Sequence, residues 1–433
     1  MTQPLRPFDT SRRLLDQALK TIPLASQTFS KSHLQFPPEI APQFIESGKG
    51  AKVWDVDGRR YTDFVNGLLS VTLGYQDPDV DAAIKTQLAS GIVFSMPHRM
   101  EMQVAEHLVN MIPCAEMVRF GKNGSDATAG AVRLARAYTG RDNVAVCGYH
   151  GWQDWYIGST ARNAGVPEAT SALTHSFVYN DLQSLQQVFE TANGKLAAVV
   201  LEPMNIAWPK PGFLEAVRSL CDAHGAVLIF DETITGFRFH NGGAQALFGV
   251  TPDLATFGKG LANGMPLSAI AGRADLMRVM EEIFFSFTMG GETLSLAAAK
   301  AVLEKLQREP VVETLKSTGE AIMDGIEKHM ADLGGPDWLK LAGHPSWSFT
   351  MIGDCPNASA WELKTLYIQE MVARGVLTLG TQNISYAHSK ADVTAFLRAF
   401  EETTSVMAQA IASETVPSKL RCKPLEPVFK VRS

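Results

Sequence analysis

The sequence predicts an α/β protein with a large domain, built on a mostly parallel central sheet, and a smaller α+β domain formed by both ends of the chain. From about residue 100 to about residue 320, near-continuous apolar strands alternate with helices, which is typical of a parallel sheet covered on both faces. The two ends instead carry a hairpin signal and short alternating strands. We therefore expect a large domain at 71–324 and a smaller domain from 1–70 and 325–433.

Length and composition agree with two domains in one globular chain. The chain has 433 residues, of which 45% are hydrophobic and 19% charged, and its net charge of −6 argues against a nucleic-acid surface. The five cysteines show no CxxC spacing, which argues against a metal site and suits reduced thiols in the cytoplasm. The first 20 residues lack the apolar core of a signal peptide, and no apolar run approaches the roughly 20 residues that span a bilayer. We expect a cytoplasmic protein with neither a membrane nor a nucleic acid as partner.

Local signals place the individual elements. A helix is expected at about 9–22, capped by Asp9, Thr10 or Ser11, and "KVWDVDGRRYTDFV" predicts a hairpin that turns at Asp57-Gly58. In the central block, the expected strands are "EMVRF", "NVAVC", "LAAVVL", "AVLIFDE", "LATF" and "LSAIAGR". Two helices between them are "ATAGAVRLARAY" and "FLEAVRSLCDAH", each followed by a glycine that can end a helix. The tail adds the short strands "SWSFTMI" and "VLTLG".

Ligands of such sheets bind outside the carboxyl ends of the strands, so the residues there are candidates. "RFGKNGSDA" places Gly124, Ser125 and Asp126 at a strand-to-helix turn, where free backbone N–H groups favour an anion such as phosphate. An ordinary capped helix is the alternative for this motif taken alone. No GxGxxG follows the first strand, so the dinucleotide fingerprint is absent.

Four further residues follow the next strands of the predicted sheet. Tyr149 and His150 in "GYHGW" can cover a planar ring, although a core aromatic is the commoner role for such a residue in isolation. Asp231 in "IFDE" follows a buried strand, where a carboxylate needs a cation or a hydrogen bond. Lys259 in "FGKGLANGMP" is the only charged residue in a glycine-rich turn.

Together these residues supply an anion site, a ring cover, a buried carboxylate and a lysine. Pyridoxal 5'-phosphate needs all four, because it has a phosphate, an aromatic ring, a protonated pyridine nitrogen and an aldehyde that condenses with lysine. The glycines around Lys259 allow the backbone to approach a flat ring. A weakly polar pocket lowers the pKa of a lysine and makes its free amine available.

The stretch "LIFDETITGFRF…GVTPDLATFGKGLANGMPLSAIAGR" resembles the class III aminotransferases, which belong to fold type I of the pyridoxal-phosphate enzymes, and is closest to glutamate-1-semialdehyde 2,1-aminomutase-like proteins. The resemblance extends from "VWDVDGRRYTDF" to "AHSKADV". It implies that Lys259 forms a Schiff base with the cofactor, that Asp231 pairs with the ring nitrogen, and that Tyr149 stacks on the ring. His150 and Glu202 match positions close to the cofactor.

The resemblance also implies a shared phosphate site. Gly124 and Ser125 would hold the phosphate, with Asp126 beside them. The loop "SFTMGGETLSLAAA" offers Thr288, which would complete the phosphate site of the partner subunit. A homodimer with shared active sites is therefore expected.

The chain departs from the family where a substrate carboxylate is often bound. No arginine lies between Gly375 and Lys390, and this wall instead offers neutral hydrogen-bonding groups, namely Thr378, Thr381, Gln382 and Asn383. Such a wall suits a polyhydroxy or amide-bearing acceptor, for example a sugar-like aldehyde or ketone. Lys31 stands where the aminomutases have an arginine and could meet an anionic substrate as a point charge, or lie solvated in a loop.

We therefore predict a pyridoxal-phosphate-dependent aminotransferase that moves an amino group between a small-molecule amine donor and an aldehyde or ketone acceptor through Lys259. An intramolecular aminomutase on the same residues is the first alternative, and it needs one substrate where a transaminase needs two. A noncatalytic binding protein that kept the fold is the second alternative, and the presence of both Lys259 and Asp231 argues against it.

Overall fold

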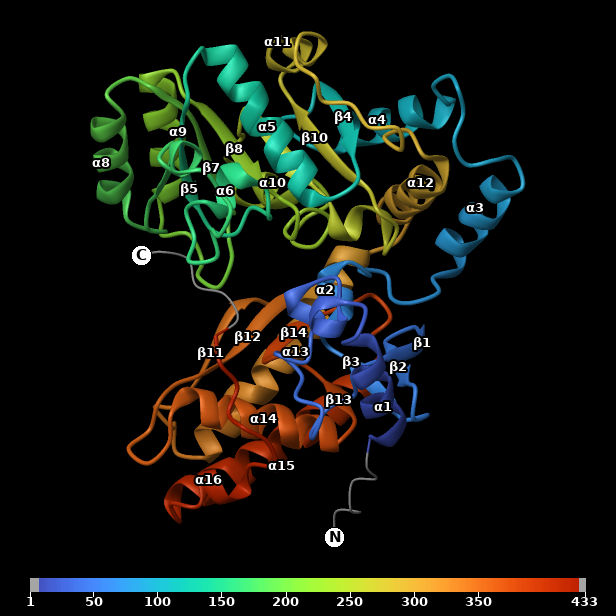
Figure 1. Cartoon of the computed structure of the whole chain (residues 1–433), viewed down its shortest axis with the longest axis vertical. Helices are drawn as coiled ribbons and strands as arrows, with labels where there is room; N and C mark the ends of the chain where they lie inside the picture. The colour runs from blue at the N-terminus through green and yellow to red at the C-terminus, as the bar shows by residue number, and fades with distance from the viewer. Residues whose placement is uncertain (1–7, 428–433) are drawn as a thin grey trace. The chain divides into compact units, whose positions relative to one another are not determined.

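The computed structural model describes residues 8–427, which form two compact units (Figure 1). One unit contains residues 8–76 and 313–427, and the other contains residues 77–312. The divisions thus fall after Gln76 and Val312, whereas the sequence suggested divisions after residues 70 and 324. No helix in this described part of the chain is both long and apolar enough to cross a membrane.

The larger unit contains a seven-stranded sheet of order β4-β10-β9-β8-β7-β5-β6. Its strands are β4 (Met117–Gly121), β5 (Asn143–Cys147), β6 (Thr174–Ser176), β7 (Leu196–Leu201), β8 (Val227–Asp231), β9 (Leu254–Phe257) and β10 (Ser268–Gly272). β10 is antiparallel to both of its neighbours, β4 and β9, and all other pairs are parallel. The prediction of a large, mostly parallel sheet is confirmed.

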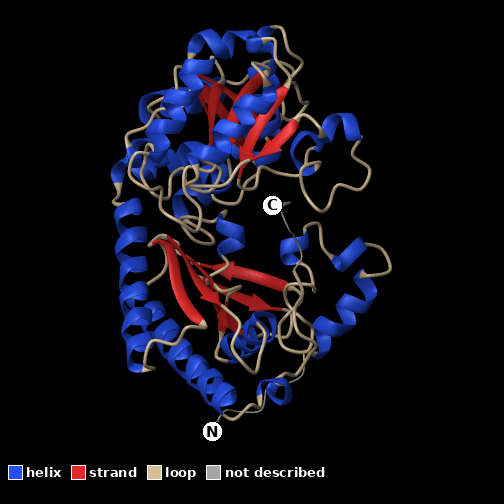
Figure 2. Ribbon diagram, turned by 90° about the vertical axis from the view of Figure 1, so that its left-hand side faces the viewer, coloured by secondary structure: helices blue, strands red, loops and turns tan. Residues whose placement is uncertain are grey.

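Helices flank this sheet (Figure 2). They are α3 (Pro78–Leu88), α4 (Arg99–Met111), α5 (Gly124–Thr139), α6 (Asp154–Ile157), α7 (Glu168–Ser171), α8 (Leu182–Ala192), α9 (Phe213–His224), α10 (Gly243–Phe248), α11 (Ala274–Met277) and α12 (Thr293–Arg308), with the short 3-10 turns η3 (Lys259–Ala262) and η4 (Arg278–Glu281). Gly140 and Gly225 end α5 and α9 in the left-handed conformation, as the sequence predicted.

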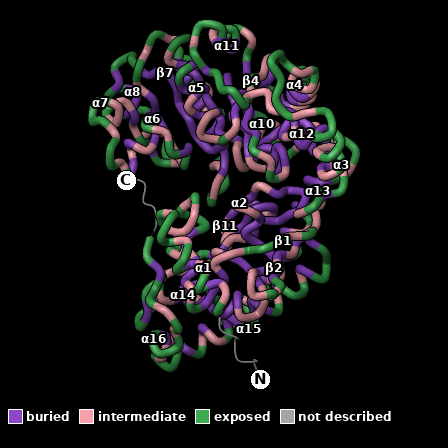
Figure 3. Tube along the Cα trace, turned by 45° about the vertical axis from the view of Figure 1, so that its right-hand side comes forward, coloured by how far each residue is buried: buried purple, intermediate pink, exposed green. Residues whose placement is uncertain are grey.

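The central strands β7 and β8 are almost entirely apolar because both faces of the sheet are covered there. Val227 and Ile229 of β8 pack with α5 in one core, whereas Leu228 and Phe230 pack with α8 and α9 in another. All six residues of β7 are buried, and its trace is buried along its length in Figure 3. A side-chain period of two, with both faces apolar, produces the continuous apolar runs seen in the sequence.

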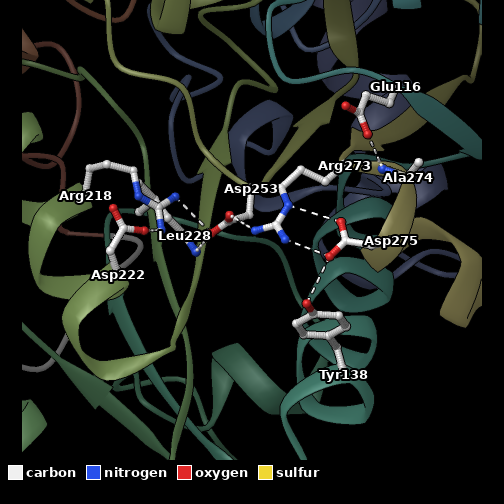
Figure 4. Close-up of polar contacts among 9 residues, drawn as sticks. All are labelled: Glu116, Tyr138, Arg218, Asp222, Leu228, Asp253, Arg273, Ala274 and Asp275. Atoms are coloured by element: carbon white, nitrogen blue, oxygen red, sulfur yellow. Dashed lines mark hydrogen bonds and ion pairs between the residues drawn. The ribbon is translucent and has the colours of Figure 1, made fainter.

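Asp253, just before β9, is the centre of an ionic cluster (Figure 4). Its carboxylate accepts hydrogen bonds from Arg273 Nη1 at 2.8 Å, from Arg218 Nη1 at 2.9 Å and from the backbone N–H of Leu228 at 2.8 Å. Arg273 continues the network to Asp275, which accepts a hydrogen bond from a tyrosine of α5. This Asp253 cluster ties β8, β9, α9 and α11 together where the chain enters the strands.

The smaller unit combines two sheets with helices. The first sheet has the order β1-β2-β3-β13 and the second the order β11-β12-β14. The strands are β1 (Ile45–Lys49), β2 (Lys52–Asp55), β3 (Arg60–Asp63), β11 (Leu339–His344), β12 (Trp347–Ile352), β13 (Val376–Leu377) and β14 (Thr381–Asn383). The helices are α1 (Asp9–Ala18), η1 (Pro23–Ala25), η2 (Phe29–Lys31), α2 (Asn66–Leu69), α13 (Val311–Asp332), α14 (Ala360–Ala373), α15 (Lys390–Ala412) and α16 (Val416–Lys419). β13 pairs in parallel with β3, so both ends of the chain build this unit.

The hairpin and first helix of the smaller unit show one success and one error of the sequence prediction. β2 and β3 pair antiparallel around the turn that contains Asp57 and Gly58, as predicted. The prediction of a cap from Asp9, Thr10 or Ser11 is wrong, because none of their side chains caps α1. The carboxylate of Asp57 instead accepts hydrogen bonds from the backbone N–H groups of Thr10 at 2.9 Å and Ser11 at 3.1 Å.

Candidate active site

Apart from Thr288, the predicted site residues of the larger unit lie at or shortly after the carboxyl ends of its strands. β4, β5, β7, β8 and β9 run in the same direction, so the segments that follow them emerge at one edge of the sheet. Residues that are far apart in the sequence, such as Gly124 after β4 and Lys259 after β9, are therefore brought to the same edge.

Lys259 opens the short turn η3, directly after β9 and Gly258. Its backbone has a φ of 41°, a left-handed conformation that is uncommon for a residue with a side chain. The side chain is partly exposed, and its amine has no hydrogen-bond or ion-pair partner among residues 8–427. Burial lowers the pKa of Lys259, against the opposing effect of the nearby carboxylates of Asp231 and Glu202. A lysine in this environment has a readily available neutral amine.

Asp231 is buried at the end of β8 and is held by three groups. Its carboxylate lies 2.8 Å from His150 Nδ1 and accepts hydrogen bonds from the Thr256 hydroxyl and the Thr233 backbone N–H, both at 3.1 Å. Burial acts to raise the pKa of Asp231, but the interactions with His150 and the hydrogen bonds from Thr233 together outweigh it and hold the pKa below its ordinary value. The carboxylate is therefore ionised and fixed in orientation.

The His150 ring lies between two hydrogen-bond acceptors. Nδ1 faces the Asp231 carboxylate, and Nε2 lies 3.1 Å from the carbonyl oxygen of Cys147. The ring is only 1% exposed, so water cannot replace either partner. A neutral imidazole carries one N–H, so both contacts are hydrogen bonds only where both ring nitrogens carry a proton. His150 thus positions Asp231, a role that the sequence did not specify.

The turn between β4 and α5 is built as the sequence predicted, with Gly124 and Ser125 as the first two helical residues. The Asp126 carboxylate accepts the backbone N–H groups of Lys122 at 3.1 Å and Asn123 at 2.7 Å, so it stabilises the turn. The Ser125 hydroxyl accepts a hydrogen bond of 3.4 Å from a backbone N–H and keeps its own proton available. The turn thus presents a helix N-terminus and a hydroxyl donor.

Glu202 follows β7 and is buried next to Tyr149. Its carboxylate accepts the Tyr149 backbone N–H at 3.2 Å and the Asn205 side-chain amide at 2.8 Å. Burial raises the pKa of Glu202. Tyr149 is 51% exposed, and its ring centroid lies 5.7 Å from that of Tyr156 in an edge-on arrangement. Glu202 therefore fixes the backbone that carries this ring.

The residues expected to meet the substrate lie in the smaller unit. Gln382 is fully buried in β14, and both ends of its amide are paired, with Ser348 at 3.0 Å and Thr350 at 2.9 Å. The Asn383 amide donates to a backbone carbonyl at 2.8 Å and is also buried. Lys31 is exposed in η2. The Gln382 amide thus pairs within its own sheet, whereas the Asn383 amide bonds outside it, to the carbonyl of Val65 before α2.

Of two further candidates, Thr378 stabilises a turn of its own chain and Thr288 is exposed. The Thr378 hydroxyl donates to the carbonyl of Thr381 at 2.8 Å and accepts the Gly380 N–H, so it stabilises a tight turn. Thr288, in the larger unit, is exposed in the loop before α12.

Thr233 and Thr256 were not anticipated from the sequence. Thr256 lies opposite Asp231 in the pairing of β8 with β9 and is fully buried. A lone threonine in the apolar strand "LATF" is the signal that could have identified it, because a buried hydroxyl needs a partner. Thr233 stands between two turns: a Cβ atom at Gly124 would lie 3.0 Å from its Cγ2 atom, and one at Gly258 would lie 3.3 Å from it. Glycine at both positions lets the β4–α5 turn and the lysine turn approach each other.

Comparison with known proteins agrees with this geometry. The model of the family described as "Aminotransferase class-III" matches residues 37–382. The chain belongs to the class III aminotransferase family. A 3-aminobutyryl-CoA aminotransferase of Cloacimonas acidaminovorans is 33% identical over 403 residues, which are 91% of this chain and 96% of that protein. A glutamate-1-semialdehyde 2,1-aminomutase of Syntrophobacter fumaroxidans is 36% identical over 379 residues, which are 81% and 88% of the two chains.

Among solved structures, the pyridoxal-phosphate internal aldimine form of the Sphingopyxis sp. MTA144 FumI protein superposes on this aminotransferase with a TM-score of 0.87. It is 30% identical and covers 95% of this chain and 99% of its own. An ω-transaminase from Sphaerobacter thermophilus gives a TM-score of 0.83 at 27% identity, with 91% and 97% of the two chains covered. The predicted fold type I architecture, the enzyme class and the pyridoxal-phosphate cofactor are confirmed at the level of the family.

Proposed function

We propose that this class III aminotransferase transfers an amino group between a small amine donor and an aldehyde or ketone acceptor, with Lys259 as the residue that holds pyridoxal 5'-phosphate and moves the proton. The observation that carries the proposal is the amine of Lys259, which has no hydrogen-bond or ion-pair partner among the described residues and a pKa that burial lowers. Both buried carboxylates that influence it, Asp231 and Glu202, follow neighbouring strands of the same sheet edge.

The residues at this edge fit the cofactor. Gly124 and Ser125 offer N–H groups and a hydroxyl to a phosphate, and Asp231 offers an ionised carboxylate to a protonated ring nitrogen. A Cβ atom at Gly258 would lie 3.6 Å from the Cα atom of Gly124, which is van der Waals contact, so the lysine turn and the phosphate turn are direct neighbours. The partly exposed ring of Tyr149 can cover a planar ligand. When bound, pyridoxal phosphate supplies a ring that accepts the electrons released at the substrate carbon.

The residues of the chain would hold and transfer the protons that this chemistry needs. With the cofactor bound, the neutral Nζ of Lys259 would take the proton from the substrate carbon that bears the amino group and return it to C4′ of the cofactor, first as a general base and then as a general acid. Asp231 keeps the positive charge of the ring nitrogen in place, and His150 keeps Asp231 ionised and oriented. Burial of Glu202 raises its pKa, so a protonated carboxyl there would add no second full negative charge beside Asp231.

An aminomutase reaction on the same residues is the second candidate, because proteins named glutamate-1-semialdehyde 2,1-aminomutase are up to 36% identical to this chain. The two reactions differ in stoichiometry. A transaminase forms a keto product from the donor in proportion to the amine formed from the acceptor. A mutase converts one substrate and releases no keto product.

We further propose a homodimer in the cytoplasm. Exposed apolar side chains are concentrated in two segments of the larger unit. The first lies before and at the start of α4 and contains Ile92, Val93, Phe94, Met96 and Met102, and the second lies before α12 and contains Phe284, Phe287 and Met289. Exposed patches of this kind mark protein interfaces, and the second region contains Thr288. This supports a partner subunit that covers the patch and receives Thr288 at its phosphate site. The five unpaired cysteines suit a reducing compartment.

The test starts from Lys259→Ala, with Lys195→Ala as a control, because Lys195 is an exposed lysine outside the site. Wild-type protein with pyridoxal phosphate should show a visible absorption band that shifts when an amine is added. Borohydride should trap the cofactor on the Lys259 peptide. Lys259→Ala should lose the band, the trapped peptide and all turnover, and Lys195→Ala should keep them. Turnover near the wild-type rate in Lys259→Ala would refute the proposal.

The sharing of Thr288 has a separate test. Subunits carrying Lys259→Ala are mixed with subunits carrying Thr288→Ala. In a mixed dimer with shared sites, both defects fall on one site and the other site is intact. Activity should therefore recover on mixing, and proven subunit exchange without recovery would contradict the sharing of Thr288.

A further inference from the structure

The larger unit contains an ion pair that joins the predicted phosphate turn to the base of the loop that carries Thr288. Lys122 lies between β4 and Gly124, and its Nζ is 3.0 Å from Oε2 of Glu292. Both side chains are largely buried, with 16% and 12% of their surfaces exposed. The pair is therefore shielded from solvent more than an ordinary surface ion pair.

Glu292 also caps the helix that follows the loop. Its carboxylate accepts the backbone N–H of Leu294 at 2.6 Å, that of Ser295 at 3.3 Å and the Ser295 hydroxyl at 2.6 Å. Burial acts to raise the pKa of Glu292, but the bonds from Ser295 and Lys122 outweigh it and hold the pKa below its ordinary value. One carboxylate thus fixes both the start of α12 and the side chain of Lys122.

The loop before Glu292 is anchored at both ends and exposed between them. At its start, Phe285 is buried and its carbonyl accepts Arg119 Nη2 at 3.1 Å. At its end stands Glu292. Thr288 lies between these anchors in an exposed segment, inside a turn closed by the Gly290 N–H on the Phe287 carbonyl. Because Phe285 belongs to the core, the position of Thr288 depends on the anchor at Glu292.

We propose that the Lys122–Glu292 pair is a positioning device that couples the phosphate turn of one subunit to the Thr288 that the same subunit delivers to its partner. This inference rests on the proposed function, in which Thr288 completes the partner's phosphate site. Lys122 and Glu292 act through Thr288 and need not touch the cofactor. α12, which Glu292 caps, also packs against η3, the turn that begins with Lys259. The loop is therefore fixed to both turns of its own subunit's site.

The first experiment is a double-mutant cycle on cofactor affinity. Lys122→Met removes the charge and keeps the chain length, Lys122→Arg keeps the charge, and Lys300→Met breaks an exposed ion pair elsewhere on α12 as a matched control. Lys122→Met should weaken the binding of pyridoxal phosphate about tenfold and leave that of pyridoxal, which has no phosphate, unchanged. Lys122→Arg and Lys300→Met should resemble the wild type. In a Thr288→Ala background, Lys122→Met should have little further effect.

Equal losses for pyridoxal phosphate and pyridoxal would overturn the inference, because the effect would then not pass through the phosphate. Additive losses from Lys122→Met and Thr288→Ala would also overturn it, because Lys122 would then act on the phosphate directly. A wild-type protein without a Lys259-dependent absorption band would refute the proposed function, and this inference with it. The outcomes therefore separate the two proposals.

The second experiment tests delivery across the dimer. Subunits carrying both Lys122→Met and Lys259→Ala are paired with wild-type subunits, so the only site with Lys259 belongs to the wild-type chain. That site receives its Thr288 from the Lys122→Met chain. Its affinity for pyridoxal phosphate should fall about tenfold relative to a dimer in which the partner carries Lys259→Ala alone. Equal affinities in the two mixed dimers would overturn the inference.

Discussion

Removal of the His150 ring tests the electrostatic design of the site most directly. The ring is buried with Nδ1 2.8 Å from the Asp231 carboxylate and Nε2 3.1 Å from a carbonyl oxygen. Two unit charges at this separation attract by about 6 kcal/mol at an effective dielectric constant of about 20. That value is an upper bound, because both charges are spread over several atoms. Breaking a buried pair by removing one partner costs about 3–5 kcal/mol, which we take as the expected range for His150→Leu.

The sign of the pH dependence follows from Asp231. The pKa of Asp231 is below its ordinary value in the folded protein, although burial acts to raise it, because His150 is present. Its carboxylate therefore contributes stability that is present above the unfolded pKa of about 3.9 and is lost as pH falls through the folded pKa. In His150→Leu, burial still raises the pKa of Asp231 but the interactions with the His150 ring are lost, so this pKa should rise. The stability gap between wild type and variant should be larger at about pH 7 than at about pH 4.5.

The assay is urea unfolding of the cofactor-free protein at both pH values, with His150→Asn as the matched variant. Asparagine can donate a hydrogen bond to Asp231 without a charge, so its loss of stability should lie between those of wild type and His150→Leu. The absorption band of the cofactor-loaded protein provides a second readout of the orientation of Asp231. A loss below about 1 kcal/mol in His150→Leu, with no pH dependence, would refute the charged pair.

Two further predictions concern stability. Asp253→Asn should lower the free energy of unfolding by about 2 kcal/mol, because it removes the central charge of the Asp253 cluster. Asp275→Asn, at the exposed end of the cluster, should lower it by less than about 1 kcal/mol. Equal losses for the two variants in urea unfolding would contradict this prediction. Gly124→Ala should lower the free energy of unfolding by about 1 kcal/mol, because the new Cβ atom crowds the Cγ2 atom of Thr233. Thr233→Ser removes that Cγ2 atom and should restore most of the lost stability in the double variant. Additive losses in the double variant would show that this contact is not the cause.

The sequence predicts well those parts of the fold that depend on local pattern. Apolar runs identify the strands of the larger sheet because both of its faces are covered, and glycines such as Gly140 and Gly225 mark helix ends through their left-handed conformation. Asp231 and Lys259 are recognisable because each follows such a run directly. Local pattern thus locates the edge of the sheet at which the site lies.

Contacts between distant residues are what the pattern could not supply. The N–H groups at the start of α1 bind Asp57, which is 47 residues from Thr10. His150 is 81 residues from the carboxylate it pairs with. Each of these two side chains has a plausible local role, Asp57 as a turn residue and His150 as a ring cover. Only the folded structure shows that each binds a partner far away in the sequence.

The residues expected to bind the substrate also have partners that the sequence pattern does not reveal, and this affects the choice of acceptor. The neutral residues of the region after Gly375 suggested a wall that binds hydroxyl or amide groups. The structure gives Gln382 two partners within its own unit, and the Thr378 hydroxyl closes a turn. A buried amide with both ends paired offers nothing to a ligand, because breaking either bond leaves a buried polar group unsatisfied at about 1–3 kcal/mol. The preference for a sugar-like acceptor therefore loses the support of Gln382 and Thr378, and acceptor choice has to be argued from the residues around Lys259 and Tyr149, both of which are partly exposed.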